Sequence, residues 1–309
     1  MIRLRTTAPA KVNLVLRVGP RRPDGYHDVE TLLVPLDLAD EVRVTVRPDR
    51  PGPVTCRCPG HPALDGASNL AARAAEALLA RLGRRAAVDV VIRKRIPVTA
   101  GLGGGSSDAA AVLRCLDRAL GPLPRRLLHE VAASVGSDVP FFLGAGPAWA
   151  RGRGERLRAA SAPALHLLLA YPRDPAQAIR AGEAYAWLDE AREGRPLARR
   201  GRARAARPEN DLMAPCLEHR PALRPLAGWL AEAGAASAMM SGSGPTFFGS
   251  FPGRSGARAA AGRMARRRVG TGGLEVIVAR TQMRMPGVSP WKSPRSASSR
   301  SRKTSSRRT

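Results

Sequence analysis

Lysine is scarce in this chain of 309 residues, and acidic residues are few. Of its 51 basic residues all but four are arginine, while Asp and Glu together number 25, which leaves a formal net charge of +26. The lysines are Lys11, Lys94, Lys292 and Lys303. Such a surplus attracts anions, but an arginine skew beside many Ala, Gly and Pro residues is also typical of a codon-composition bias. Charge alone therefore selects no function.

Aromatic residues make up only 4% of the chain. A protein that stacks unpaired bases along a nucleic-acid strand needs aromatic faces, so this scarcity argues against RNA binding. The four cysteines form no Cys-x-x-Cys pair and have few histidines near them, which argues against a zinc site. Free thiols are typical of a reducing compartment, so we expect a cytoplasmic protein.

Long apolar segments are missing as well. Basic residues follow one another too closely near the N-terminus to leave the apolar stretch of a secretory signal. The longest uncharged stretch, 233–253, is interrupted by Gly, Ser and Pro and lacks the continuous apolar run of a bilayer-spanning helix. We therefore expect neither export nor a membrane partner.

Apolar periodicity indicates a mixed α and β chain. Alternation over residues 12–18 predicts a strand with one buried face, and it places Lys11 and Asn13 together on the other face. Similar patterns predict further strands near 26–34, 42–46, 88–92 and 165–170. Helical spacing predicts helices over 68–83, 109–120 and 127–136. Asp138 is therefore expected at a helix end.

A glycine-rich loop, Pro97-Val-Thr-Ala-Gly-Leu-Gly-Gly-Gly-Ser-Ser-Asp108, precedes the helix predicted from residue 109. Backbone N–H groups at a helix N-terminus, freed of nearby Cβ atoms by glycine, bind phosphate oxygens. The loop has neither the Gly-Lys-Ser/Thr ending of a P-loop nor the third glycine of a dinucleotide fingerprint. The alternative interpretation is a plain turn with Ser106 or Ser107 as the helix N-cap.

Three segments in this order resemble the motifs of the GHMP kinases, a family of small-molecule kinases. They are Ala8-Pro-Ala-Lys-Val-Asn13, the glycine-rich loop and Met240-Ser-Gly-Ser-Gly-Pro-Thr246. Arg22-Pro-Asp-Gly-Tyr-His27 and Gly136-Ser-Asp-Val-Pro140 are similar to one branch of this family, whose substrate carries a cytidine diphosphate. The resemblance covers roughly residues 5–280.

The resemblance implies an α+β fold of two domains, an N-terminal half like ribosomal protein S5 domain 2 and a ferredoxin-like C-terminal half. We place the ATP-binding domain at 1–160 and the C-terminal domain at 161–283. The acid-free, Ser- and Arg-rich segment 284–309 is expected to be a disordered basic tail, and the arginine-rich stretch 192–207 a solvated loop. A monomer or a homodimer is expected.

The resemblance also implies phosphoryl transfer, which requires phosphate binding, charge neutralisation and a group that accepts the hydroxyl proton. We assign that proton acceptor to Asp138 and the neighbouring ammonium to Lys11. A lysine inside a motif is less easily explained by composition in a chain that otherwise uses arginine. The alternatives are a solvated strand cation for Lys11 and a loop cap for Asp138.

ATP and Mg²⁺ are the expected cofactors. The residues that we assign to ATP are Asn69, Pro97, Gly101, Leu102, Gly103, Gly104, Gly105, Ser106 and Ser107. Asn69 alternatively only caps the helix predicted after it. Ser107 is the one hydroxyl that we name as a magnesium ligand.

For the cytidine-diphosphate substrate, the resemblance assigns base recognition to Tyr26, His27 and Tyr185. Tyrosine offers a face for stacking and histidine a hydrogen bond to the pyrimidine edge. The remaining candidate substrate contacts are Asn13, Asp138, Gly242 and Ser243. A half-buried Tyr26 beside an exposed His27, and a tight turn at Gly242, are the plainer alternatives.

Two other functions remain open. One is a different GHMP kinase, of the homoserine or mevalonate type, against which the segment ending in Tyr26-His27 argues. The other is an S5-like RNA-binding protein that uses the basic surplus for phosphate backbones. Binding of a nucleic-acid backbone requires neither Lys11, the glycine loop nor Asp138 in particular, so we expect that no nucleic acid is required.

Overall fold

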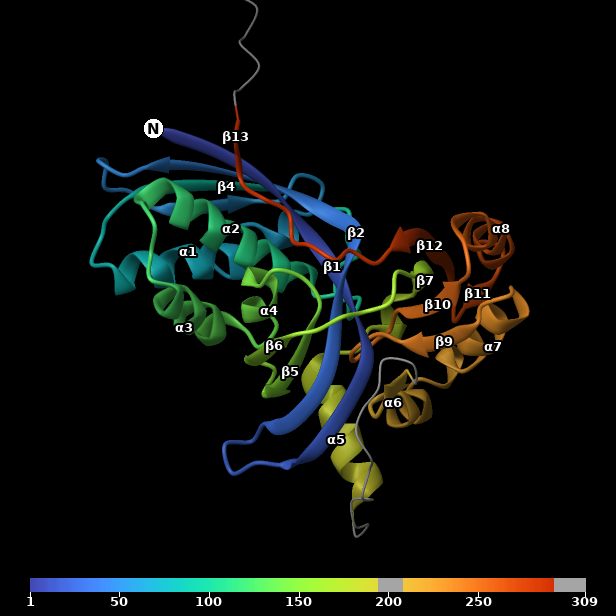
Figure 1. Cartoon of the computed structure of the whole chain (residues 1–309). Helices are drawn as coiled ribbons and strands as arrows, with labels where there is room; N and C mark the ends of the chain where they lie inside the picture. Colours follow the sequence, from blue (N-terminus) through green and yellow to red (C-terminus); the bar gives the residue numbers. More distant parts are fainter. Residues whose placement is uncertain (194–207, 292–309) are drawn as a thin grey trace, which may run out of the picture.

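One long hairpin runs through both halves of the molecule (Figure 1). Its strands are β1 (Ile2–Arg21) and β2 (His27–Arg47), which pair antiparallel from Ile2 opposite Val46 to Arg21 opposite His27. The computed structural model describes residues 1–193 and 208–291, and all structural statements below concern these residues. Irregularities in the pairing near Lys11 and Asn13 interrupt the β1–β2 register at the motif predicted to be catalytic.

The first sheet is built on this hairpin. Its main path runs β13-β1-β2-β4-β3, while β5 pairs with β2 and β6, and β8 pairs with β1. The pairs β1–β8 and β3–β4 are parallel, and the others are antiparallel. The added strands are β3 (Val54–Arg57), β4 (Ala87–Arg93), β5 (Ala148–Gly152), β6 (Arg156–Ala159), β8 (Glu209–Asn210) and β13 (Ser289–Pro290).

The second sheet is antiparallel throughout, in the order β11-β12-β7-β10-β9. Its strands are β7 (His166–Pro172), β9 (Ser237–Met240), β10 (Phe247–Phe251), β11 (Arg268–Val269) and β12 (Gly272–Arg280). The predicted domain boundary at residue 160 falls between the last N-terminal strand of the first sheet, β6, and the first strand of the second, β7.

Helices cover each sheet. Those that pack with the first sheet lie together below it in Figure 1 and are α1 (Leu70–Arg81), α2 (Gly104–Leu120), α3 (Arg125–Val135) and α4 (Val139–Leu143). Those of the second half are α5 (Ala181–Arg192), α6 (Met213–His219), α7 (Pro225–Glu232) and α8 (Arg254–Met264). Short 3₁₀ turns lie at Pro62–Leu64, Pro175–Gln177 and Pro221–Leu223. Within the described ranges, no helix is long and apolar enough to cross a membrane.

A shared apolar core joins the two sheets. Val12 and Leu14 of β1 and Val34 of β2 pack with Leu167 of β7 and Phe248 of β10, and all five are fully buried. Ile96, directly before the glycine-rich loop, and Ala100 and Leu102 within it belong to the same core. The alternating residues of β1 therefore anchor the loop between the two halves, as burial of apolar area is the main favourable term in packing.

Two predictions require correction. The runs at 26–34 and 42–46 are one strand, β2, because β1 pairs with Pro35 and again with 39–41, on both sides of an irregularity in the register. Residues 284–291 are not disordered as expected, since β13 pairs with β1 and the N–H of Trp291 donates to Arg3 O. The Trp291 ring also lies 5.0 Å from the Arg43 guanidinium. The segments 194–207 and 292–309, parts of the predicted loop and tail, lie outside the described residues.

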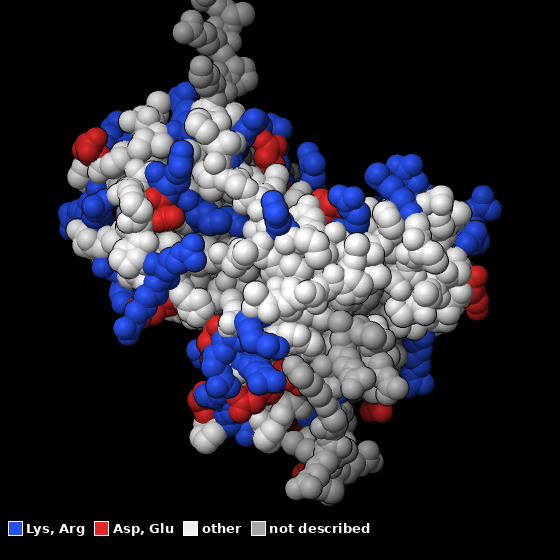
Figure 2. All heavy atoms as spheres, viewed as in Figure 1, with Lys and Arg blue, Asp and Glu red and all other residues white. Residues whose placement is uncertain are grey.

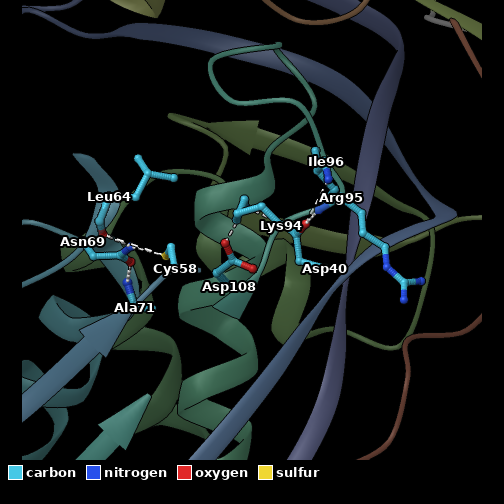
Figure 3. Close-up of polar contacts among 9 residues, drawn as sticks. All are labelled: Asp40, Cys58, Leu64, Asn69, Ala71, Lys94, Arg95, Ile96 and Asp108. Atoms are coloured by element: carbon cyan, nitrogen blue, oxygen red, sulfur yellow. Dashed lines mark hydrogen bonds and ion pairs between the residues drawn. The ribbon is translucent and has the colours of Figure 1, made fainter. Parts of the chain in front are cut away.

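A buried group of three ionisable side chains, Asp40, Lys94 and Asp108, holds the start of the glycine-rich loop (Figure 3). Lys94 Nζ lies 2.5 Å from Asp40 Oδ2 and 2.7 Å from Asp108 Oδ2, and all three side chains are at most 6% exposed. The other oxygen of Asp40 accepts the backbone N–H groups of Arg95 and Ile96. These contacts tie β2, the end of β4 and the first turns of α2 together at the point where the loop begins.

Burial raises the pKa of Asp108 to about 7, although the Lys94 charge lowers it, and the Asp40 charge adds to the rise. Burial alone would lower the pKa of Lys94, but Asp108 and Asp40 together raise it. The Lys94 ammonium is thus the cation shared by two buried carboxyl groups. One of these, that of Asp108, keeps its proton toward neutral pH.

We predict that Asp108→Asn loses less stability relative to wild type as the pH rises from 5 to 7. The unfolded aspartate titrates near pH 4 and the folded one near 7, so the native state alone keeps the proton between these values and wild-type stability falls with rising pH. Asparagine lacks this proton. The difference in unfolding free energy, from urea denaturation, should shrink by up to about 1.4 kcal/mol per pH unit.

Asp89→Asn is the matched control. Burial alone would raise the pKa of Asp89, but its hydrogen bonds with Arg47 and Thr55 lower it below the usual value. Asp89 is therefore ionised in the folded and in the unfolded chain over this range. The difference in unfolding free energy between wild type and Asp89→Asn should stay constant between pH 5 and 7. A difference for Asp108→Asn that is equally constant, or that widens, would contradict the assigned burial of the proton.

Candidate active site

A cavity of about 750 Å³ opens where the β1–β2 hairpin meets the glycine-rich loop, α4 and α5. Both predicted catalytic residues and all predicted substrate contacts line it. These are Lys11, Asn13, Tyr26, His27, Asp138, Tyr185, Gly242 and Ser243. Of the residues assigned to ATP, Gly101, Gly103 and Ser106 line the same cavity. Segments far apart in the sequence therefore converge on one site.

Lys11 lies at the centre of this cavity. Its ammonium donates to Asn13 Oδ1 at 2.7 Å and to Gly101 O at 3.0 Å, and it lies 3.6 Å from Asp138 Oδ2. Its side chain is 5% exposed, whereas that of Asp138 is 36% exposed. The predicted shared face of Lys11 and Asn13 is thus confirmed by a direct hydrogen bond. A solvated strand cation is excluded for Lys11.

Asn13 is held in one orientation by its neighbours. Its Oδ1 accepts from Lys11, and its Nδ2 donates to Thr31 Oγ1 at 2.8 Å. Thr31 in turn donates to Val15 O at 2.6 Å. This chain of hydrogen bonds, from Lys11 through Asn13 and Thr31 to Val15 O, fixes the position of the Lys11 ammonium.

Asp138 directly precedes α4 and occupies its N-cap position, but its side chain makes no capping hydrogen bond. The carboxylate is therefore free of the structural role that was the alternative for this residue. It faces the cavity beside Lys11, where it is accessible to a substrate hydroxyl.

The glycine-rich loop requires glycine for two different reasons. Gly101 and Gly103 have φ of 73° and 71°, in the left-handed region that other residues rarely adopt. A Cβ on Gly101 would in addition collide with Ser241 O and approach Gly244 O to 2.7 Å. Backbone of the third motif therefore packs directly on the loop, and Ser241 Oγ donates to Gly101 O at 3.2 Å.

Helix α2 starts earlier than predicted, at Gly104, with Gly103 as its N-cap. Neither Ser106 nor Ser107 caps it. Its first intrahelical bond runs from Ser107 N to Gly103 O at 2.9 Å, so the N–H groups of the preceding turn have no partner within the helix. This leaves the positive end of the helix dipole at the cavity wall.

The two serines of this helix differ. Ser106 lines the cavity, whereas Ser107 is fully buried and its hydroxyl has no hydrogen-bond partner. The structure therefore presents the hydroxyl of Ser106, and not the one predicted to bind magnesium, to the cavity. Among the described residues, no group of three or more His, Cys, Asp and Glu side chains could hold a metal ion.

The remaining residues assigned to ATP lie around the loop and not on the cavity wall. Leu102 is buried in the shared core, and its carbonyl accepts the N–H of Lys11 at 2.9 Å. Asn69 caps α1 through Ala71 N at 2.9 Å and donates to Leu64 O at 2.8 Å (Figure 3). The capping alternative for Asn69 is thus present in the structure. Pro97, Gly104 and Gly105 are not lining residues either.

The third motif closes the site from the second sheet. Gly242 has φ of 57°, and a Cβ there would lie 3.1 Å from Lys11 Nζ and 3.2 Å from Asn13 Oδ1. Asn210 of β8 holds this turn by donating to Met240 O at 2.9 Å and to Gly242 O at 2.8 Å. The Gly242 turn is therefore a wall of the Lys11 site.

Aromatic residues line the other end of the cavity. The His27 ring stacks on Tyr185 with centroids 5.2 Å apart and an interplanar angle of 20°. Tyr26 is 51% exposed, and the Arg153 guanidinium lies 4.8 Å from its ring centroid. Burial and the charge of Asp138 raise the pKa of the Tyr185 hydroxyl, so this ring is an apolar face. His27 is buried, against the plainer alternative.

Sequence reasoning did not find every residue of the site. Asp189 Oδ1 of α5 lies 2.8 Å from His27 Nε2, within hydrogen-bond distance. Arg21 and Arg153 bring positive charge to the same cavity. Arg153 lies in a Gly-Arg-Gly turn that could have signalled a close approach of backbone. Nothing in the periodicity of α5 distinguishes Asp189 from its acidic neighbour Glu190.

Comparison with known proteins places this site in a family. The family model described as the GHMP kinases N terminal domain matches residues 69–146, and the GHMP kinases C terminal model matches 195–269. The chain is 62% identical over 314 residues to the 4-diphosphocytidyl-2-C-methyl-D-erythritol kinase of Anaeromyxobacter sp. (strain K), covering 100% of both chains. A protein of the same name from Geobacter metallireducens is 43% identical over 82% of this chain and 91% of its own.

Solved structures agree. A crystal structure of 4-(cytidine 5'-diphospho)-2C-methyl-D-erythritol kinase superposes with a TM-score of 0.70 and 34% identity, over 90% of this chain and 99% of the other. The homoserine kinase of Cytophaga hutchinsonii, with 18% identity, TM-score 0.68, and coverage of 93% and 98%, shares the fold. The chain belongs to the GHMP kinase family, in its group of 4-diphosphocytidyl-2-C-methyl-D-erythritol kinases.

Proposed function

We propose that this chain transfers the γ-phosphoryl group of ATP to the 2-hydroxyl of 4-(cytidine 5'-diphospho)-2-C-methyl-D-erythritol, a step of the non-mevalonate route to isoprenoid precursors. One observation carries the proposal. The Lys11–Asp138 pair lies in a single cavity with a phosphate-binding type of loop on one side and a cluster of aromatic rings on the other. A nucleotide and a cytidylyl substrate can therefore meet at this pair.

Asp138 is the proton acceptor of the proposed reaction. The substrate oxygen attacks the γ-phosphorus, the bond from that phosphorus to the β-bridging oxygen breaks, and the hydroxyl proton passes to the Asp138 carboxylate. Lys11 Nζ, 3.6 Å from that carboxylate, stabilises its charge and stands beside the oxygens that gain charge during transfer. ADP and the phosphorylated alcohol are the products.

The glycine-rich loop supports ATP binding on two grounds. The unpaired N–H groups at the start of α2 suit the β- and γ-phosphates. In addition, a Cβ on Gly103 would lie 3.0 Å from Lys11 Cγ and 3.1 Å from the Phe142 ring, so the absence of a side chain there keeps the floor of the site open. The candidates for the nucleotide side remain the residues assigned above, namely Asn69, Pro97 and Gly101 to Ser107.

Magnesium would be held mainly by ATP phosphates and water, which this cation favours over protein ligands. The cavity offers the Ser106 hydroxyl as an oxygen donor, which fits such a partial set. When bound, the ion neutralises charge on the transferred phosphoryl group. We propose Ser106 in place of Ser107 because Ser107 is closed off by packing.

The cytidylyl group would occupy the end of the cavity with Tyr26, His27 and Tyr185. Arg21 and Arg153 line the cavity near Tyr26 and bring positive charge that suits a diphosphate. A homoserine or mevalonate substrate has no base to place against these rings, which disfavours the other kinases. Basic residues occur in several groups on the face seen in Figure 2, with acidic residues among them, and do not form the single stripe of a nucleic-acid groove.

We also place the enzyme in the cytoplasm, where its substrates are metabolites. All four cysteines, Cys56, Cys58, Cys115 and Cys216, are free and buried, which supports a reducing compartment. No partner is required by the proposed reaction, and a monomer or a homodimer would both carry the whole cavity in one chain.

Asp138→Asn should lower kcat by about 10²–10⁴-fold, because it removes the proton acceptor. ATP binding should persist, since the carboxylate is not part of the loop. A coupled assay of ADP release with the cytidylyl substrate, together with ATP titration, measures both. Glu130→Gln on exposed α3, where Glu130 pairs with Arg81 and Arg126, is the control with unchanged kinetics. Undiminished kcat in folded Asp138→Asn would overturn the base assignment.

Gly101→Ala should raise the KM for ATP and lower kcat. The new methyl group would meet Ser241 O and Gly244 O, so the loop and the third motif must separate. Gly121→Ala is the matched control, because Gly121 also has a positive φ, 98°, but a Cβ there would meet nothing within 4 Å. It should cost about 1–3 kcal/mol of stability and leave the kinetics unchanged. Similar kinetics in both variants would contradict a role for loop contact in catalysis.

A further inference from the structure

Asp189 holds His27 from the opposite wall of the cavity. His27 lies at the start of β2 and Asp189 in the last turn of α5, and the contact between Nε2 and Oδ1 is 2.8 Å. The His27 side chain is 5% exposed and that of Asp189 35% exposed. Tyr185, one helical turn before Asp189, stacks on the same imidazole. Tyr185 therefore holds the face of the imidazole ring, and Asp189 holds its Nε2 edge.

The carboxylate decides where the imidazole carries its proton. An ionised carboxylate only accepts hydrogen bonds, so Nε2 must be the protonated nitrogen. In the neutral ring, Nδ1 is then an acceptor. Among the residues that the structure describes, no group hydrogen-bonds Nδ1, and His27 lines the cavity. Nδ1 is therefore the nitrogen available to a ligand.

An acceptor at this place distinguishes the two common pyrimidines. Cytosine presents an amino group, a donor, at the position where uracil presents a carbonyl oxygen, an acceptor. An acceptor facing the amino group forms a hydrogen bond. The same acceptor facing the uracil oxygen leaves two buried acceptors opposed, and unpaired buried polar groups are the strongest source of discrimination in such sites.

We propose that Asp189 is a positioning residue that makes the site selective for cytosine over uracil, by holding His27 in the tautomer whose Nδ1 accepts from the amino group of the base. The proposal rests on the proposed function, because it concerns the base of the same substrate. Asp189 itself touches no reacting atom.

The other charged groups of this end of the cavity do not supply this selectivity. Arg21 and Arg153 are donors only and would favour the carbonyl of uracil if they faced the base. Arg22 is bound to Asp24 and Asp28 at 3.0 Å each, at the exposed turn of the hairpin. Asp189 is thus the acidic group in contact with the imidazole.

The test compares kcat/KM for the cytidylyl substrate with kcat/KM for its uridylyl analogue. We expect wild type to prefer cytosine and Asp189→Asn to reduce that preference about tenfold or more, since the amide both donates and accepts and leaves either tautomer possible. The KM for ATP should not change. Asp189→Glu, which keeps an acceptor-only group, should retain most of the preference.

Glu190→Gln is the matched control on the same helix, because Glu190 faces His219 at 3.5 Å and not the cavity. It should leave the ratio unchanged. A merely structural role of Asp189 would lower both kcat/KM values alike, so an unchanged ratio in Asp189→Asn would overturn the proposal. Failure of wild type to phosphorylate the cytidylyl substrate would instead overturn the proposed function.

A second measurement needs no variant. The ¹⁵N chemical shifts of His27 in the wild-type protein at pH 8 report which imidazole nitrogen is protonated. We expect Nε2 protonated and Nδ1 bare. A proton on Nδ1 in the neutral ring would overturn the proposal even if Asp189→Asn failed to fold.

Discussion

The contact on which the site depends is that of the Lys11 ammonium with three oxygens from three parts of the chain. Asn13 belongs to the same strand, Gly101 to the glycine-rich loop and Asp138 to the start of α4. A cation buried this deeply requires such partners, since removal from water is costly unless each donor is satisfied. The ammonium therefore fixes the position of the Asp138 carboxylate, the proposed proton acceptor, relative to the glycine-rich loop.

The fold supplies this contact through the hairpin of β1 and β2. One face of β1 packs in the core shared by the two sheets, which leaves Lys11 and Asn13 on the cavity side. The same hairpin carries Tyr26 and His27 at its turn, so the two ends of the cavity, with the proposed catalytic pair and the proposed cytosine site, are attached to one hairpin. Helix α5 lines the end with Tyr26 and His27, and the third motif lines the end with Lys11.

Features encoded by local sequence could be predicted, and those made by distant contacts could not. Alternation in β1 placed Lys11 beside Asn13, and glycine spacing located the loop. The length of β2 was missed because Pro35 and the residues after it break the alternating pattern, whereas β1 pairs with β2 on both sides of this break. The buried group of three ionisable side chains could not be predicted, because Asp40, Lys94 and Asp108 come from separate segments that meet only in the folded chain. The contact of Asp189 with His27 could not be predicted either, because it depends on how α5 packs beside the start of β2.

The burial of both described lysines has a chemical consequence. Lys11 and Lys94 have side chains only 5% and 6% exposed, and the other lysines of the chain lie outside the described residues. Arginine guanidinium groups do not lose a proton in proteins and do not react as amines. Over the described surface, an amine-selective acylating reagent would therefore find few lysine side chains to label.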